Sequence, residues 1–109
     1  MSTALSKPNV AILAKFRDVL AQMYGSQLER VVLYGSHARD EAGPDSDYDI
    51  AVFLRNLSDR WAEADRIAIV ASNILNETGA LIHAMPYPDK AYEERTPLMR
   101  EIRREGVDL

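Results

Sequence analysis

The chain has 109 residues, with 47% hydrophobic and 28% charged side chains, a formal net charge of −4 and no cysteine. This length predicts one domain, residues 1–109, with enough apolar residues for a core. The composition excludes disulfides and cysteine zinc sites, the acidic balance argues against stable binding of duplex nucleic acid, and no apolar run reaches the roughly 20 residues that a membrane span needs.

The first predicted element is a helix over residues 8–24. It follows a polar N-terminal segment without the apolar stretch of a signal peptide, so we expect a cytoplasmic protein. Pro8 suits the first helical turn, and Gly25-Ser26 ends the helix. The apolar residues at helical spacing are Val10, Leu13, Phe16, Leu20 and Met23.

Two short strands follow, separated by a loop. Residues 30–34 form a β-branched apolar run typical of a buried strand, and Gly35 breaks it. Residues 36–40 are expected to form a single helical turn, and Gly43-Pro44-Asp45 indicates a further turn. Residues 47–54 then predict a second strand.

A long helix is predicted over residues 58–76, and Thr78-Gly79 stops it. Its expected apolar stripe consists of Trp61, Ala64, Ile67, Ala68, Ala71, Ile74 and Leu75. Residues 80–85 predict a third strand, which we expect Pro86 and Pro88 to end.

The tail is predicted to be helical. A short segment covers residues 90–95, and a last helix runs from Thr96 as N-cap and Pro97 to a stop at Gly106. The element order therefore predicts an α/β (α+β) domain in which helices cover a three- or four-stranded sheet. The arginines of this tail could meet an acidic partner or lie on a solvated helix face.

Gly35 and Ser36 form a candidate anion site. A strand that ends in glycine and passes into a helical turn presents backbone N–H groups, and glycine lets a phosphate approach them closely. The alternative is an ordinary strand-to-helix turn in which Ser36 is the N-cap.

Asp47 and Asp49 form a candidate metal site. Side chains alternate along a strand, so the two carboxylates are expected on one face. Their repulsion is relieved by a hard cation such as Mg²⁺, which usually arrives with substrate phosphates. The alternative is a polar loop end, with Asp47 as a cap and Asp49 solvated. A short connection would make the two strands antiparallel neighbours and bring these carboxylates beside Gly35-Ser36.

These residues carry a family resemblance. Residues 34–39, Tyr-Gly-Ser-His-Ala-Arg, and 45–52, Asp-Ser-Asp-Tyr-Asp-Ile-Ala-Val, resemble the Gly-Ser-x10-Asp-x-Asp signature of DNA polymerase β-like nucleotidyltransferases. The small size and element order extend the resemblance toward the minimal stand-alone nucleotidyltransferase (MNT) domains, and residues 97–106 are similar to their tail. The resemblance implies the polymerase β-like nucleotidyltransferase fold, a small mixed sheet flanked by helices.

The resemblance also implies functions for individual residues. The phosphate contacts that it implies are Gly35, Ser36, Arg39 and Ser46, and the Mg²⁺ ligands are Asp47 and Asp49. Arg39 could equally pair with Asp40 or Glu41. Asp40 departs from the glycine that such domains often carry there, and His37 is interpreted as a surface residue.

The third carboxylate of the superfamily, on the strand after the long helix, is not evident in residues 80–85. His83 is the only polar side chain there, and it could be a base, a substrate contact or a structural histidine of the sheet. By alternation it should share a face with Leu81 and Met85, away from the helix-covered face. Glu77 and Asp89 flank the strand as weaker substitutes.

Two functions fit these residues. The first is an enzyme that transfers AMP from ATP with Mg²⁺ to a hydroxyl, on the resemblance to MNT antitoxins that act on small helical HEPN-type toxins. Because the chain has no room for a second substrate domain, a protein acceptor is favoured. The second is a binding module that neutralises such a helical partner by contact, which the missing carboxylate favours.

Overall fold

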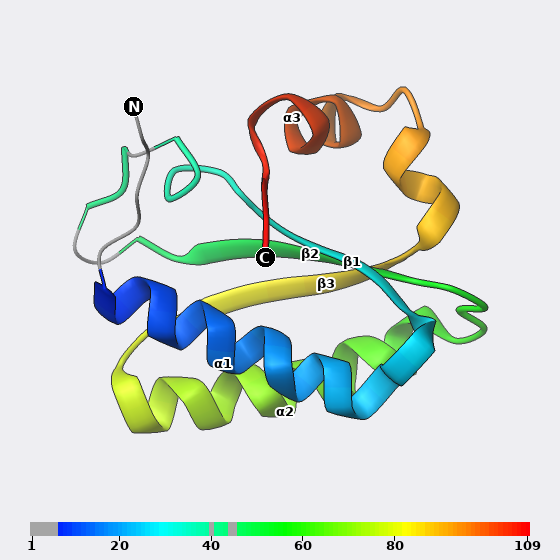
Figure 1. Cartoon of the computed structure of the whole chain (residues 1–109). Helices are drawn as coiled ribbons and strands as arrows, with labels where there is room; N and C mark the ends of the chain where they lie inside the picture. The colour runs from blue at the N-terminus through cyan, green and yellow to red at the C-terminus, as the bar shows by residue number, and fades with distance from the viewer. Residues whose placement is uncertain (1–6, 40, 44–45) are drawn as a thin grey trace.

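A four-stranded sheet with helices on both faces forms the fold (Figure 1). The computed structural model describes residues 7–39, 41–43 and 46–109, so Asp40, Pro44 and Asp45 lie outside the described part. The elements in chain order are α1 (Lys7–Tyr24), the 3₁₀ turn η1 (Gly25–Gln27), β1 (Leu28–Tyr34), β2 (Tyr48–Leu54), α2 (Arg60–Thr78), β3 (Ile82–Pro88), the 3₁₀ turn η2 (Asp89–Glu93), α3 (Pro97–Glu105) and β4 (Val107–Asp108).

The strand order is β3-β2-β1-β4, and the sheet is mixed. β1 pairs antiparallel with β2 and with β4, while β2 pairs parallel with β3 through the crossover helix α2. The short connection between β1 and β2 produces the antiparallel neighbours that the sequence predicts. The expected α/β class and small mixed sheet are therefore confirmed.

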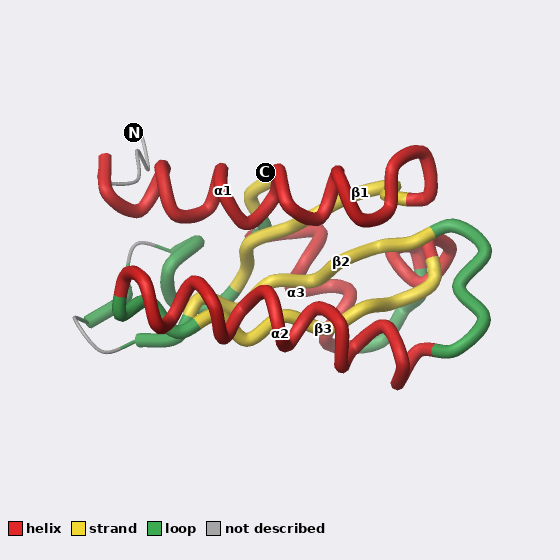
Figure 2. Tube along the Cα trace, turned by 90° about the horizontal axis from the view of Figure 1, so that it is seen from below, coloured by secondary structure: helices red, strands yellow, loops and turns green. Residues whose placement is uncertain are grey.

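α1 and α2 cover one face of the sheet, below it in Figure 1 and in front of it in Figure 2. Leu13, Phe16 and Leu20 of α1 are buried there. Val10 and Met23, which we expected in the same stripe, are 47% and 38% exposed because they fall at the margins of the buried arc. Among the described residues no helix is long and apolar enough to span a membrane.

α2 buries a narrower stripe than the sequence predicts. Ile67, Ala71 and Ile74 are buried against the sheet. Trp61, Ala68 and Leu75 recur every seven residues, so they share one flank of the helix, roughly 100° around from the buried side, and all three are exposed. The helix begins after Asp59, whose carboxylate accepts a hydrogen bond from the Ala62 N–H, one turn along the chain.

The opposite face carries a smaller core. Val32, Ala51 and Phe53 of the sheet pack there against η2 and α3, which contribute Ala91, Met99 and Ile102. Thr96 caps α3 as predicted, since its hydroxyl accepts a hydrogen bond from the Met99 N–H at 3.2 Å. α3 and η2 therefore cover the part of this face that lies over the middle of β1 and β2.

Pro86 does not end the third strand, as we had expected, but lies within β3, whose last residue is Pro88. The Tyr48 N–H donates to the Leu81 carbonyl at 2.9 Å, so in this parallel ladder the odd-numbered residues of β3 bond to β2. The even-numbered residues then direct their backbone groups outward. Both prolines occupy outward positions of an edge strand, where the missing N–H breaks no ladder bond.

β4 is an addition that the sequence did not predict. Gly106 ends α3 without a left-handed conformation, and a Cβ there would lie 2.3 Å from the Ile102 carbonyl oxygen and 2.4 Å from Val32 Cγ1. Glycine is needed because the chain passes this close to the helix and to β1.

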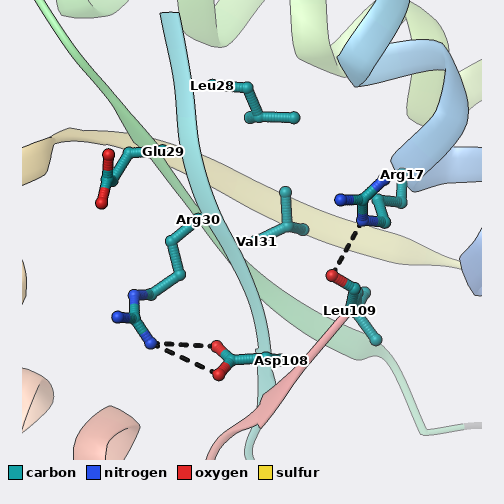
Figure 3. A pocket seen from close by; sticks show the side chains of 7 residues that line it. All are labelled: Arg17, Leu28, Glu29, Arg30, Val31, Asp108 and Leu109. Atoms are coloured by element: carbon teal, nitrogen blue, oxygen red, sulfur yellow. Dashed lines mark hydrogen bonds and ion pairs between the residues drawn. The ribbon is translucent and has the colours of Figure 1, made fainter. Parts of the chain in front are cut away.

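The last residues are held in place by two arginines, as Figure 3 shows. Arg30 pairs with Asp108 at 3.2 Å and stacks on the Tyr92 ring, and Arg17 donates to the Leu109 carbonyl at 2.8 Å. These residues line a hollow of about 210 Å³ at the start of β1, the opposite end of that strand from Gly35. Since both guanidinium groups already have partners, the hollow is best interpreted as part of the C-terminal anchor.

Candidate active site

The candidate site lies where β1 ends and β2 begins. Tyr34 of β1 pairs with Asp49 of β2 across the antiparallel ladder, so the glycine-serine turn and the carboxylate meet at the same end of the sheet (Figure 1). Asp49 alternates with Ala51 and Phe53, whose side chains lie in the α3-covered core, so its side chain belongs to that face. The site is therefore the part of this face beyond the α3 core.

Gly35 is in direct contact with the carboxylate of Asp49. Its φ is +76°, and a Cβ at this position would lie 2.5 Å from Asp49 Oδ2. Any larger residue would be strained and would displace that oxygen. Gly35 therefore has two functions: it allows the left-handed conformation of the turn, and it leaves room for the carboxylate of Asp49.

The turn after Gly35 is closed by its own backbone. The Arg39 N–H donates to the Gly35 carbonyl at 3.1 Å, and the Glu41 N–H donates to the Ser36 carbonyl at 2.9 Å. The N–H groups of residues 36–38 have no acceptor among the described residues. Donors of this kind at the start of a helical turn are suited to an anion, and anion binding here stays a prediction.

Asp47 lies one residue before β2 and is exposed, whereas the Asp49 side chain is 34% exposed. Both groups offer hard oxygen ligands, the kind that Mg²⁺ prefers, and Mg²⁺ takes only one or two carboxylates when substrate phosphates complete its shell. The described residues contain no cluster of three or more acidic, histidine or cysteine side chains able to hold a metal. Two carboxylates are as many as Mg²⁺ takes beside substrate phosphates, so Asp47 and Asp49 fit a cation that binds together with a nucleotide.

His83 lies beside Asp49, its register partner on β3. The ring Nδ1 is 3.7 Å from Asp49 Oδ1, and the histidine side chain is 62% exposed. Ile82 and Ala84 pack in the core under α1 and α2, so His83 faces the opposite side, as alternation predicts.

Glu77 and Asp89, the two acidic residues that flank β3 and could replace the third carboxylate, do not lie at the candidate site. Glu77 pairs with Lys15 of α1 at 2.9 Å, on the face covered by α1 and α2. Asp89 follows the far end of β3 and accepts a hydrogen bond from the Lys90 N–H. Glu77 therefore lies on the opposite face of the sheet from Asp49, and Asp89 lies at the opposite end of β3.

His37 is not simply a surface residue, as we had expected, but half-buried. Its ring stacks on the ring of Tyr48 at 3.8 Å between centroids, and Nε2 lies 3.0 Å from the Ser46 carbonyl oxygen. The Ser46 hydroxyl in turn accepts a hydrogen bond from the Gly43 N–H at 2.9 Å. These contacts hold the loop between β1 and β2, and the hydroxyl of Ser46 still has a proton to donate.

Arg39 is held by three glutamates. It pairs with Glu41 at 2.9 Å and with Glu105 and Glu101 of α3 at 3.4 and 3.8 Å, and the hydrogen bond to Glu41 raises its pKa. The pair with Glu41 was one of the alternatives that the sequence left open. The α3 partners were missed because no local spacing links residues more than sixty positions apart.

Tyr34 borders the site on the α3 side. Burial raises its pKa to about 12, and the nearby charges of Asp49 and Glu101 act in the same direction. The phenol is therefore neutral at pH 7 and separates the carboxylate of the site from α3.

Comparison with known proteins identifies the family. The family described as Nucleotidyltransferase domain matches residues 13–105. The chain belongs to this family. The motif resemblance is thereby confirmed, and with it the expected enzyme class, nucleotidyltransferase.

Similar proteins extend the comparison. A Methanocaldococcus jannaschii protein named as a candidate protein adenylyltransferase is 24% identical over 100 residues, which cover 92% of this chain and 97% of that protein. A chain of a solved toxin–antitoxin structure with AMP-PNP has a TM-score of 0.58 at 18% identity, covering 86% and 69% of the two chains.

A second solved structure is a tri-AMPylated HEPN toxin of Shewanella oneidensis in complex with its MNT antitoxin. It matches with a TM-score of 0.50 at 16% identity, covering 89% of this chain and 70% of that one. At these identities the two structures show that the fold is shared.

Proposed function

We propose that this nucleotidyltransferase transfers AMP from ATP to a hydroxyl of a protein partner, with Mg²⁺ held between Asp47, Asp49 and the triphosphate. The observation that supports the proposal is the contact of Gly35 with Asp49, which brings the candidate anion-binding turn next to the carboxylate. Gly35, Ser36, Arg39 and Ser46 are proposed to bind the phosphates.

In the proposed reaction the acceptor oxygen attacks the α-phosphorus of ATP. A new P–O bond forms, the bond to the β-phosphate oxygen breaks, and pyrophosphate leaves. When bound, Mg²⁺ supplies charge neutralisation for this in-line displacement. The acceptor proton passes to solvent or to His83, whose ring lies 3.7 Å from Asp49.

The proposed partner is a small helical protein of the HEPN type, and the cytoplasm is the proposed location. The relative's adenylyltransferase name, the AMP-PNP structure and the AMPylated HEPN toxin support ATP as donor and a protein as acceptor. The net charge of −4 also favours a protein partner over nucleic acid.

The alternative function is a binding module that neutralises the same partner by contact alone. It is favoured by one observation: neither β3 nor its flanking acids bring a third carboxylate to the site.

The experiment that tests the proposal is transfer of labelled AMP from ATP to the protein encoded by the adjacent reading frame, which the proposal expects to be of the HEPN type. We expect Asp47→Ala to abolish transfer. His83→Ala should lower it by no more than about 10²-fold, the low end for one acid–base group, because the metal and the geometry provide most of the activation. If the complex with this partner survives nuclease treatment but the parent chain transfers no AMP, the result supports the binding-module function and contradicts the transferase function.

Nucleotide binding is tested separately by calorimetric titration of ATP with Mg²⁺. The double variant Asp47→Asn, Asp49→Asn should lose Mg²⁺-dependent binding and keep its fold, because it removes two repelling charges and no core contact. Equal affinity in the parent and the double variant would contradict the proposed metal site.

A further inference from the structure

An apolar groove runs beside the candidate site, between α2 and the first half of β3. Its volume is about 390 Å³. Trp61, Leu75 and Leu81 line it with exposures of 67%, 38% and 47%. Exposed apolar side chains that gather in one groove, rather than singly, are typical of interaction sites.

The backbone of β3 forms one wall of this groove. Ile82 and Ala84 occupy outward positions of the edge strand, so their N–H and C=O groups point away from β2. Among the described residues neither has a backbone partner on that side. The edge is closed further along, where Arg60 donates to the Pro86 carbonyl at 2.7 Å and the prolines lack N–H groups. The unpaired stretch of the edge is thus short and is the part nearest the site; Ile82 there is 5% exposed and Ala84 is partly exposed.

The α2 wall suits an added strand. Its residues beside β3 are mostly small, with Ala64, Ala68 and Ser72 between the larger Trp61 and Leu75. A strand paired with β3 would lie about 4.8 Å away and needs such space beside the helix. Larger side chains at these positions of α2 would occupy the space that a strand paired with β3 needs.

The groove is continuous with the candidate site. His83 lines the groove and lies 3.7 Å from Asp49. Asp65 is the one carboxylate among the described lining residues, so the groove favours a segment that carries a cation at that point.

We infer that an extended segment of the acceptor protein adds to the open edge of β3 as a further strand. Its backbone bonds to Ile82 and Ala84, its apolar side chains pack on the Trp61–Leu75 flank of α2, and a basic residue meets Asp65. A hydroxyl-bearing residue next to this segment then reaches Asp49 past His83. This inference rests on the proposed function, because it names how the acceptor of that site is held.

Amide hydrogen exchange tests the backbone contacts, with the purified product of the adjacent reading frame, the proposed HEPN-type partner, as the probe. On binding, the N–H groups of Ile82 and Ala84 should exchange more slowly, by at least about tenfold, as expected for new hydrogen bonds. His83 and Met85, which already bond to β2, should change less. A complex in which Ile82 and Ala84 exchange as in the free chain overturns the inference.

Matched variants test the two walls. Ala84→Pro removes one outward N–H and should weaken partner binding by about tenfold or more, whereas Ala84→Val adds similar bulk, keeps the N–H and should bind well. Trp61→Glu should weaken binding to a similar extent, whereas Ile69→Glu, on α2 at 63% exposure but outside the groove, should not. Equal weakening by Trp61→Glu and Ile69→Glu would contradict the groove.

Two further outcomes separate this inference from others. A dimer of the chain alone that Ala84→Pro dissociates would assign the edge to a second copy and overturn the inference. If the exchange and variant results hold but no AMP is transferred, the docking surface stands and the proposed transferase fails.

Discussion

Gly35 shows how a single backbone conformation joins two parts of the site. Its positive φ and its contact with Asp49 are separate constraints, and only glycine meets both. Gly79 has nearly the same φ, +80°, at the end of α2, but a Cβ there would meet nothing within 4 Å. A substitution at Gly79 would cause backbone strain alone, whereas one at Gly35 would cause the same strain and also displace the carboxylate of Asp49.

We predict that Gly35→Ala loses Mg²⁺-dependent ATP binding, whereas Gly79→Ala keeps it. Both substitutions should lower the free energy of unfolding by about 1–2 kcal/mol through the left-handed conformation, and Gly35→Ala should also push Asp49 Oδ2 aside. Urea unfolding and ATP titration of both variants measure the two effects. Unchanged ATP affinity in Gly35→Ala would show that the carboxylate position does not matter.

At the scale of the element, α3 is capped at its N-terminus, packs on the sheet through its middle and contacts a residue of the candidate site near its end. Thr96 begins the helix, Met99 and Ile102 pack on the sheet, and Glu101 and Glu105 then meet Arg39. Arg103 of α3 links this helix to the preceding 3₁₀ turn η2, because its guanidinium donates to the carbonyls of Tyr92 and Glu94. Of the tail arginines, Arg103 thus has a structural function that the sequence did not predict.

We expect Thr96→Ala to lower the free energy of unfolding by about 1 kcal/mol, the usual effect of losing an N-cap. Thr96→Ser keeps the hydroxyl and should recover most of this loss. Denaturant titration of the three proteins checks it. If serine and alanine destabilise equally, the hydroxyl contact at Met99 does not contribute.

At the scale of the molecule, buried tyrosines link stability to alkaline pH. Burial raises the pKa of Tyr34 to about 12 and that of Tyr48, and burial with a hydrogen bond to Glu63 raises the pKa of Tyr24. A raised folded-state pKa means that the folded protein holds its proton longer than the unfolded chain. The resulting stability is complete below the ordinary tyrosine pKa of about 10 and is lost as pH rises through the folded-state value.

We therefore predict that stability is level from pH 8 to 9.5 and falls above pH 10. Tyr34 alone should account for about 1 kcal/mol by pH 11.5, after a discount for its partial exposure. Denaturant titrations across this range measure the slope, and Tyr34→Phe should reduce it. A constant free energy of unfolding up to pH 11.5 would contradict the prediction.

Most elements could be predicted because their signals are local. The Leu13-Phe16-Leu20 spacing, the Thr96 cap and the β-branched run of residues 30–34 report interactions between neighbours in the chain. The motif could be recognised for the same reason: Gly35-Ser36 follows one strand and Asp47-x-Asp49 opens the next, and a short connection between the strands constrains the geometry.

The sequence by itself thus determined the helices, three of the strands, the family motif and the face on which His83 lies. Only the tertiary structure decided the α3 partners of Arg39, the strand β4, the outward prolines of β3 and the exposed flank of α2. Each of these depends on strand order, on register or on the packing angle of a helix, which are set by contacts between residues far apart in the chain. Periodicity shows that a helix has an apolar side, but only packing decides how much of that side is covered.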